Sequence, residues 1–528
     1  MKCAKTARAG QCSKKPARSP GVSGTARRDR NALNAGGLDR YARAQPCDQG
    51  REPRTHGPGE ESDESIVPRK AVKAAGGKGL YSKNATPAGK DAEIVATLIT
   101  PEKIRDLQRA LYLRAKKDPK FRAYALYDKV YRKDVLAHAY ALVRANGGAP
   151  GSDGMTFEDI EQRGVEDLQN ELHEQLKTKS YRPGPVRRVY IPKLNGGERP
   201  LGIPNIRDRV VQMAAKLLLE PLFEADFDHD SYGFRPKKDA HKALDAIHEA
   251  LSQGMCWVLD ADVTACFDSI PHERLMKTVA ERVVDSSMLA LVKMFLEAAV
   301  VDERDGGRPR KNAKGTPQGG VISPLLANIY LNLLDRNFKR RTARRELRGR
   351  LIRYADDFVV LAPVRPDREL AWVTSFLRKL GLELHPEKTR IVAAPREQFT
   401  FLGHTHFWRW GKLHLDIGKK SRQRIRDEIR RRTRHKNVSL EALIGELNAY
   451  IRGARQYFRR VLKNRLKRLD NFVDDQIARW SKRKHESDYP DWTLVYGSAL
   501  RLRHGLEPWY RSPALRAALS RRGERTSR

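Results

Sequence analysis

Two adjacent acidic residues, Asp356 and Asp357, interrupt an apolar segment of β-type composition, RYADDFVVL at 353–361. Carboxylates among apolar side chains need a cation or dense hydrogen bonding, because burying an unpaired charge is costly. A hairpin turn at this point would let both side chains leave the strand surface. The dipeptide alone is more typical of a solvated Asp-Asp turn, so it does not by itself indicate catalysis.

A second acidic segment, WVLDADVTACFDSIPH at 257–272, favours a catalytic role. Asp260 and Asp262 share one face of the expected strand, because side chains alternate between faces. Two strands that carry carboxylates are what a two-metal nucleotidyl transferase requires, with the ions about 4 Å apart. Magnesium suits such a site, since it prefers hard oxygen ligands and keeps room for substrate phosphates.

The overall charge points to a polyanionic partner. The 528 residues include 103 Lys and Arg against 65 Asp and Glu, which leaves a net charge of +38. Phosphate backbones attract clustered cations and release condensed counterions on binding, so nucleic acid is the first expectation and an anionic membrane surface the second. The five cysteines include no C-x-x-C pair that would indicate zinc. No apolar run approaches the roughly 18 residues that a membrane helix needs.

Composition changes along the chain indicate separate regions. Residues 1–95 are rich in Gly, Pro, Ser, Ala and Arg without apolar periodicity, which predicts a basic, mostly disordered tail in preference to an organellar transit peptide. Between about 181 and 403, β-rich pieces alternate with amphipathic helices, which predicts an α+β domain. After Gly418 a sustained apolar stripe at helical spacing predicts a helical module.

The order of these motifs resembles that of the reverse transcriptases encoded by group II introns, which also act as splicing maturases. The resemblance extends over roughly residues 100–485, and YADD matches the palm-hairpin motif of the family. It implies an α+β right-hand polymerase of fingers and palm, followed by an α-helical thumb or maturase domain. By the same match, Asp262, Asp356 and Asp357 are implied as catalytic residues that hold two Mg²⁺ ions.

The resemblance also implies domain limits. The expected regions are the tail at 1–95, fingers with an N-terminal extension at 96–256, the palm with its carboxylates at 257–412, the thumb or maturase domain at 413–488, and a short basic C-terminal region at 489–528. Asp260 has no role in the family and is interpreted as a turn or surface acid.

A Gly-tipped hairpin in KLNGGERPLGI at 193–203 carries the first residues implied in nucleotide binding. Lys193 and Arg199 flank its turn, and both could reach a triphosphate. Lysine would supply a point charge and arginine a bidentate fork, the usual pair for stabilising a transferring phosphoryl group. Two exposed basic residues without such a role remain the alternative.

Three further residues are implied beside the incoming nucleotide. Phe267 lies five residues after Asp262, where similar polymerases place an aromatic gate that clashes with a ribose 2′-hydroxyl; a core phenylalanine is the alternative. Gln318 and Gly319 belong to the turn GTPQGG at 315–320, which the family places near the nucleotide and the template.

Other motifs are implied in contacts with the nucleic acid strands. Lys388, in GLELHPEKTRIV, could meet a phosphate, and Leu402 with Gly403 matches the primer grip, where glycine permits close backbone approach. Arg235, in SYGFRP, is open to a template contact or a structural role.

The helical module adds a basic stripe that resembles the RNA-binding surface of the family. Arg452, Arg455 and Arg459 recur at helical spacing opposite an apolar stripe. Such residues would recognise structured RNA by shape and phosphate contacts more than by reading bases.

We therefore expect an RNA-directed DNA polymerase that adds dNTPs to a primer 3′-OH and binds intron RNA as a maturase. Its expected partners are intron RNA or another RNA template, a DNA or RNA primer, and dNTPs, without a membrane; a homodimer is left open. The expected location is a cytoplasmic ribonucleoprotein. Two alternatives remain, a non-enzymatic RNA-binding splicing cofactor and an intron-independent reverse transcriptase of phage defence.

Overall fold

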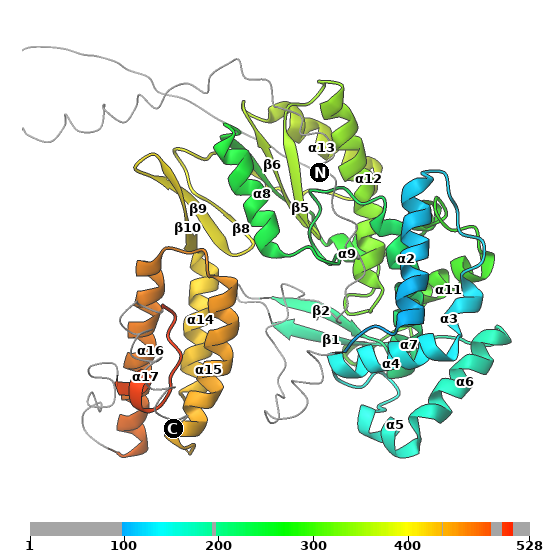
Figure 1. Cartoon of the computed structure of the whole chain (residues 1–528), viewed down its shortest axis with the longest axis horizontal. Helices are drawn as coiled ribbons and strands as arrows, with labels where there is room; N and C mark the ends of the chain where they lie inside the picture. Colours follow the sequence, from blue (N-terminus) through cyan, green and yellow to red (C-terminus); the bar gives the residue numbers. More distant parts are fainter. Residues whose placement is uncertain (1–97, 193–196, 436, 487–498, 511–528) are drawn as a thin grey trace, which may run out of the picture. The chain divides into compact units, whose positions relative to one another are not determined.

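A computed structural model describes residues 98–192, 197–435, 437–486 and 499–510. The tail predicted at 1–95 lies outside the described residues, and so does Lys193. Within the described part, helices and sheets both contribute extensively, which confirms the predicted α+β class (Figure 1).

The first described region is helical and packs around one central helix, α7 (Ile206–Glu224). This helix is apolar around most of its circumference and buried along most of its length, which is typical of a helix inside a domain. The helices that precede it are α2 (Glu102–Lys117), α3 (Tyr127–Val130), α4 (Lys133–Asn146), α5 (Phe157–Arg163) and α6 (Val165–Lys177). Of these, α2, α3, α4 and α6 pack directly on α7.

A small sheet follows the helices and contains the predicted hairpin. Strands β1 (Val186–Pro192) and β2 (Glu198–Ile203) are antiparallel, and β1 also pairs in parallel with β4 (Val300–Asp302). The last pair of the hairpin ladder joins Pro192 to Glu198, so the hairpin itself is confirmed while its tip at 193–196 lies outside the described residues.

The carboxylate motifs lie in a four-stranded antiparallel sheet with the order β5-β6-β3-β7. Its strands are β3 (Trp257–Asp262), β5 (Arg350–Tyr354), β6 (Asp357–Ala362) and β7 (Arg390–Ala393). Successive side chains of each strand point to opposite faces of the sheet, and apolar side chains pack on both faces. Val258 and Val359 face the cluster that includes helix α8 (Ala240–Ser252), whereas Leu259 and Phe358 join the main core together with helix α12 (Ser323–Ala343).

Short helices complete the layer around this sheet. They are α9 (Cys266–Ser269), α10 (His272–Val279), α11 (Ser286–Glu297), the 3₁₀ turn η1 (Glu303–Asp305) and α13 (Asp367–Lys379). Helix α13 packs on α12, and α12 in turn packs on β5. The sheet that carries the aspartates is therefore fixed by helices on both sides.

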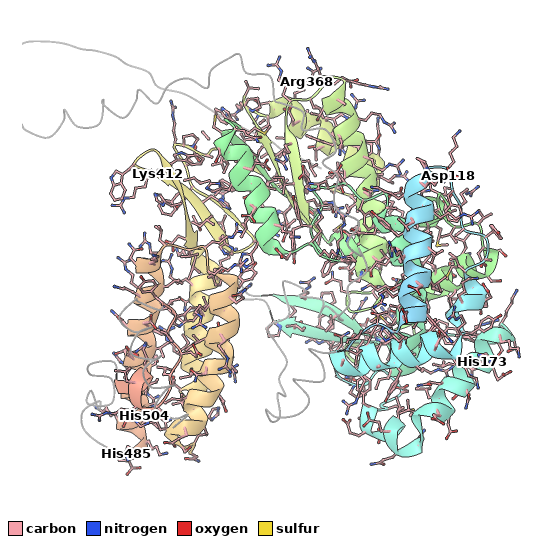
Figure 2. The ribbon with its side chains drawn as sticks, in the orientation of Figure 1. Asp118, His173, Arg368, Lys412, His485 and His504 are labelled. Carbon is pink, nitrogen blue, oxygen red and sulfur yellow. The ribbon has the colours of Figure 1, made fainter. Side chains whose placement is uncertain are left out.

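A second antiparallel sheet leads out of this domain, with the order β10-β9-β8. It consists of β8 (Phe399–Phe401), β9 (His404–Arg409) and β10 (Lys412–Ile417). Strands β9 and β10 form a hairpin, and Lys412 stands at its free end (Figure 2).

The described residues after Gly418 are mostly helical, as the apolar stripe predicts. Its helices are α14 (Lys419–Arg432), α15 (Leu440–Tyr457), α16 (Lys463–Lys484) and α17 (Ala499–Arg503). Leu500, Leu506 and Trp509 belong to the same apolar core as these helices. The core of the helical module therefore includes residues beyond 488, the limit that the family resemblance implied for this domain. No helix in the described ranges combines the length and apolarity that crossing a bilayer requires.

Candidate active site

The register of the central strands brings the two carboxylate motifs together. In the antiparallel ladder of β3 and β6, Asp262 stands directly opposite Asp357. Opposed residues in such a ladder have Cα atoms about 4.5 to 5.5 Å apart. Asp356 immediately precedes β6, in the tight turn that joins Tyr354 to Asp357. The predicted hairpin is thus confirmed, and all three aspartates lie at one end of the sheet.

Asp260 occupies a different position, although it is only two residues from Asp262. It lies inside β3, half-buried, opposite Val359 on one side and Arg390 on the other. Its carboxylate is 3.4 Å from the Arg390 guanidinium. Burial raises the pKa of Asp260, and the charge of Arg390 opposes that shift. The interpretation of Asp260 as a turn or surface acid is wrong, because this residue lies within strand β3 and is half-buried.

A buried arginine holds the turn between β5 and β6. Arg353 is 0% exposed and donates a hydrogen bond to the carbonyl of Ala355 at 2.9 Å. The same guanidinium contacts Asp335 and Asn328 of helix α12, each at 2.9 Å. Ala355 has a φ of 59°, a left-handed conformation that alanine rarely adopts. The hydrogen bond from Arg353 therefore stabilises an unfavourable backbone conformation next to Asp356.

The partner of Arg353 is an equally buried carboxylate. Asp335 is 4% exposed, and burial raises its pKa while the charge of Arg353 opposes the shift. A charge in such surroundings needs a partner, because desolvation penalises the ionised form. Sequence reasoning missed this pair, although an arginine within the apolar strand RLIRY was a visible signal.

The segment that contains Tyr232 and Gly233 packs against the other side of this turn. The backbone N–H of Tyr232 donates to the carbonyl of Arg353 at 2.8 Å, and Asn328 donates to the carbonyl of Gly233 at 2.8 Å. A Cβ atom on Gly233 would lie 2.9 Å from the carbonyl carbon of Tyr354 and closer still to the backbone nitrogen of Ala355. Only glycine fits here without displacing the turn that carries Asp356.

Lys388 lies against strand β3. Its ammonium is 2.6 Å from a carboxylate oxygen of Asp262. The segment that carries it is held by a backbone hydrogen bond of 2.8 Å from His385 to the carbonyl of Asp262. The contact with phosphate expected from the sequence stays a prediction, whereas the contact with the carboxylate is present. This cation neutralises part of the negative charge that three nearby aspartates concentrate.

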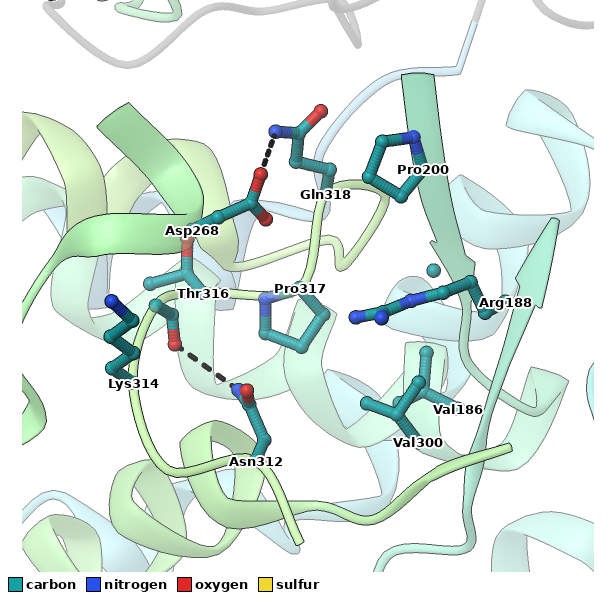
Figure 3. Close-up of a pocket in the computed structure, with 12 residues that line it drawn as sticks. Val186, Arg188, Pro200, Asp268, Val300, Asn312, Lys314, Thr316, Pro317 and Gln318 are labelled. Atoms are coloured by element: carbon teal, nitrogen blue, oxygen red, sulfur yellow. Dashed lines mark hydrogen bonds between the residues drawn. The ribbon is translucent and has the colours of Figure 1, made fainter. Parts of the chain in front are cut away.

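The Pro-Gln-Gly turn joins the β1–β2 hairpin to the segment that follows β3. Arg199 donates to the side-chain oxygen of Gln318 at 2.7 Å, and the Gln318 amide donates to Asp268 at 2.8 Å (Figure 3). Gly319 has a φ of 123° and approaches the carbonyl of Gly202. The sequence-predicted residues Arg199, Gln318 and Gly319 are therefore neighbours, and Gln318 connects Arg199 to Asp268, to which sequence reasoning assigned no role.

Phe267 is positioned by the same turn. Its carbonyl accepts a hydrogen bond from Thr316 at 2.7 Å, and its side chain is largely buried. A small pocket of about 20 Å³ beside it is lined by residues that include Arg188, Asp268 and Lys314 (Figure 3). This volume has room for about one water molecule and is too small for a nucleotide.

Family matches cover two consecutive parts of the chain. Residues 191–406 match "Reverse transcriptase (RNA-dependent DNA polymerase)", and residues 422–495 match "Group II intron, maturase-specific domain". This chain belongs to the group II intron-encoded reverse transcriptase and maturase family. The first match contains all three aspartates, and the second covers most of the helical module.

Individual relatives agree with this assignment. Protein YkfC of Escherichia coli (strain K12) is 36% identical, with 57% of this chain and 87% of that protein covered. Group II intron-encoded protein LtrA of Lactococcus lactis subsp. cremoris is 37% identical, with 40% of this chain and 34% of LtrA covered. The chain thus matches most of the first relative and about a third of the second. A solved structure of telomerase from Candida albicans is 12% identical over 62% of this chain and 63% of that chain, with a TM-score of 0.37, too low to support a functional inference.

In this reverse transcriptase, the aspartates supply the donor type that Mg²⁺ prefers. Three carboxylates at one end of a sheet fit a hard divalent ion that also binds substrate phosphates. Across the described ranges, however, no group of three or more His, Cys, Asp or Glu side chains is arranged to hold a metal ion. The ion pair of Lys388 with Asp262 offers a physical reason, because the ammonium already occupies one carboxylate.

The residues matched to the primer grip form the turn between β8 and β9. Leu402 and Gly403 have φ values of 47° and 73°, and the carbonyl of Leu402 accepts a hydrogen bond of 2.9 Å from the Tyr457 hydroxyl of α15. The maturase-specific helices are therefore connected directly to this turn. An added Cβ on Gly403 would lie 2.7 Å from the Ser421 hydroxyl, so a larger residue would have to displace that side chain and adopt an unfavourable positive φ.

The basic residues of the maturase-specific domain differ in their environments. Arg452 and Arg459 are exposed. Arg455 instead forms an ion pair of 2.8 Å with Glu507 and donates to the carbonyl of Pro508 at 2.8 Å. Arg455 therefore holds the segment that contains Glu507 and Pro508 against α15. The helical spacing of the arginines could not indicate this partner.

Arg235 has a structural role. It is buried, pairs with Glu224 at 2.8 Å and donates to the carbonyl of Ser231 at 2.6 Å. Of the two readings that the sequence left open, these contacts favour the structural one, because little of the guanidinium remains for a template.

Proposed function

We propose that the three aspartates of this reverse transcriptase form a working polymerase site that adds dNTPs to a primer 3′-OH on an RNA template. The observation that carries the proposal is the register that sets Asp262 opposite Asp357, with Asp356 in the adjoining turn. Carboxylates at these positions would hold two Mg²⁺ ions. When bound, Mg²⁺ supplies activation of the attacking hydroxyl and stabilisation of the leaving oxygen.

The residues of the chain would have distinct tasks in this reaction. Lys388 would release Asp262 when the ions bind, because one carboxylate oxygen cannot be fully shared between an ammonium and a metal. The ammonium would then be free to contact a phosphate. Arg199, together with Lys193, would stabilise charge on the triphosphate. Arg199 can do so only if it leaves Gln318, to which it is now hydrogen-bonded.

Other residues would position the substrates. Phe267 would exclude a ribose 2′-hydroxyl, and Gln318 with Gly319 would lie beside the nascent base pair. Leu402 and Gly403 would contact the primer strand. This assignment is supported by the mutual proximity of Arg199, Gln318, Gly319 and Phe267 around one turn.

We also propose that the chain binds intron RNA as a maturase in a cytoplasmic ribonucleoprotein. The match to the maturase-specific domain supports this reading over an intron-independent enzyme of phage defence. Arg452 and Arg459 would contact phosphates, and Arg455 would stabilise the surface that presents them. A homodimer stays a prediction.

A primer-extension assay tests the polymerase proposal. The full chain should incorporate dNTPs on an RNA template annealed to a DNA primer, and Asp356→Ala should abolish incorporation. Absence of incorporation by the wild-type chain would instead support the non-enzymatic splicing cofactor. Equal incorporation by both proteins would exclude Asp356 from the site. Intron splicing that persists in Asp262→Ala would show that the two activities are separable.

Gly233→Ala is expected to lower primer extension about a hundredfold, the order of effect of a displacement near 1 Å in a catalytic group. The added methyl group meets backbone atoms of Tyr354 and Ala355, so the turn that carries Asp356 must move. Steady-state extension with saturating primer and template measures the effect. Gly445→Ala is the matched control, since its added Cβ would meet no atom within 4 Å beyond its chain neighbours and the adjoining backbone of its own helix. Unchanged activity of Gly233→Ala would contradict the role assigned to this segment.

A further inference from the structure

The free end of the β9–β10 hairpin carries an exposed tryptophan. Trp410 is 70% exposed, whereas the other tryptophans in the described part of the chain are half-buried or buried. It forms the turn with Gly411, and both residues have positive φ, 51° and 70°. Such two-residue turns favour Asn, Asp or Gly, and a bulky side chain at positive φ is a conformational outlier. The hairpin therefore exposes a large aromatic ring to solvent although its backbone conformation is unfavourable. Such strain is typical of functional sites, so it indicates a function for the ring.

Two cations surround this ring. The guanidinium of Arg409 lies 4.0 Å from the centroid of the Trp410 ring. Lys412 is the cross-strand partner of Arg409, is exposed, and stands at the hairpin end (Figure 2). The stretch from 399 to 415 contains no Asp or Glu, so the hairpin itself carries a net positive charge.

The same face of the hairpin continues with aromatic rings. Phe407 and His414 are cross-strand partners two residues further from the tip, with ring centroids 5.6 Å apart. Side chains two residues apart in a strand share a face, so this pair lies in line with Arg409 and Lys412. Cations and flat rings thus alternate along a hairpin that begins at the Leu402–Gly403 turn.

We infer that the end of the β9–β10 hairpin is a binding site for single-stranded nucleic acid, in which a base stacks on Trp410 and the adjoining phosphates contact Arg409 and Lys412. Single strands offer the unpaired π-face that stacking needs, and every base has one, so the site would tolerate any sequence. A duplex covers its base faces and would gain only the phosphate contacts. An acidic protein partner would pair with the cations but would leave the ring without a specific occupant.

This inference deepens the proposed function, and it is tested by binding alone so that its failure can be distinguished from failure of catalysis. The full chain, without dNTPs or Mg²⁺, is titrated against fluorescein-labelled oligo(dT), oligo(U) and a blunt DNA duplex by fluorescence anisotropy. No catalytic step takes place under these conditions, so the readout depends on binding alone.

Trp410→Ala is expected to weaken binding of the single strands about tenfold, the order of one lost base stack, and to leave the duplex almost unaffected. Trp410→Phe should restore most of the affinity, because a smaller ring still stacks. The double variant Arg409→Gln/Lys412→Gln should reduce the salt dependence of single-strand binding by about 0.7 in log–log slope for each lost phosphate contact. A loss on oligo(dT) alone would indicate primer DNA, and a loss on oligo(U) alone would indicate RNA; either result supports the site.

Tyr124→Ala is the matched control, because Tyr124 is 73% exposed but lies outside the hairpin, between α2 and α3. It should not change binding of any probe. Two results would overturn the inference: unchanged single-strand affinity of Trp410→Ala, or an equal loss of affinity for the single strands and for the duplex. Thermal melting of each variant verifies that the fold persists.

Discussion

Asp357→Asn is expected to lower the rate of dNTP incorporation about a thousandfold, equivalent to about 4 kcal/mol of transition-state stabilisation. The same substitution should leave the melting temperature unchanged or slightly raised. Asp357 faces Asp262 across the ladder, and like charges at directly opposed positions destabilise a sheet by about 0.2 to 1 kcal/mol. Activity should therefore fall without a loss of stability, as measured by single-turnover primer extension and thermal melting of the same preparation.

Asp260→Asn provides the control for this experiment within the same sheet. Asp260 is an aspartate of the same strand as Asp262, but it faces Val359 in β6 and pairs with Arg390. Its replacement should change incorporation by no more than about twofold, since lost partly exposed ion pairs have small effects. If Asp260→Asn were as inactive as Asp357→Asn, or if Asp357→Asn lost stability together with activity, a metal-binding role for Asp357 would no longer explain the loss.

Arg353→Met is expected to destabilise the protein by about 3 to 5 kcal/mol, because it leaves the buried carboxylate of Asp335 without its counter-charge. Both side chains are almost completely buried, so solvent cannot compensate. Urea unfolding of the full chain measures the difference. Arg365→Met is the comparison, since Arg365 pairs at 3.0 Å with Asp367 on the surface and its loss should cost about 0.5 kcal/mol or less.

A double variant separates the structural role of Arg353 from its effect on the turn. Arg353→Met/Asp335→Leu removes both charges and should recover most of the lost stability, since apolar residues of similar volume often replace a buried pair at no net cost. It should still extend primers poorly, because the carbonyl of Ala355 has lost its hydrogen-bond donor. Full activity in the double variant, or stability as low as in Arg353→Met, would show that the ion pair does not position the turn.

The elements around the site were predictable where the signal was local. The apolar segments interrupted by Asp262 and by Asp356–Asp357 predicted two strands and a hairpin. The strands and the hairpin are present in the structure. The glycine-rich segment before Arg199 predicted the β1–β2 hairpin, and the apolar stripe after Gly418 predicted the last helices. Each of these features depends on side-chain alternation or turn chemistry over a few residues, which the sequence displays directly.

Other features depend on partners that are distant in the chain. The sequence presented Arg455 as one member of an exposed basic stripe, but Glu507 and Pro508 bind it. Lys388 pairs with Asp262, and Gln318 connects Arg199 to Asp268. A charged side chain carries no local mark of the residue that it will meet, so these contacts appear only when strands and helices are assembled.

By itself, the sequence determined the chemical type of the site: three carboxylates in apolar strands, an excess of cations for a polyanionic partner, and motifs in the order of a group II intron reverse transcriptase. The tertiary structure decided which aspartates meet, because the register sets Asp262 rather than Asp260 opposite Asp357. It also decided how their turn is held, through the buried Arg353 and the close approach of Gly233. Residue type is encoded locally, whereas register, burial and pairing result from packing segments that are far apart in the chain.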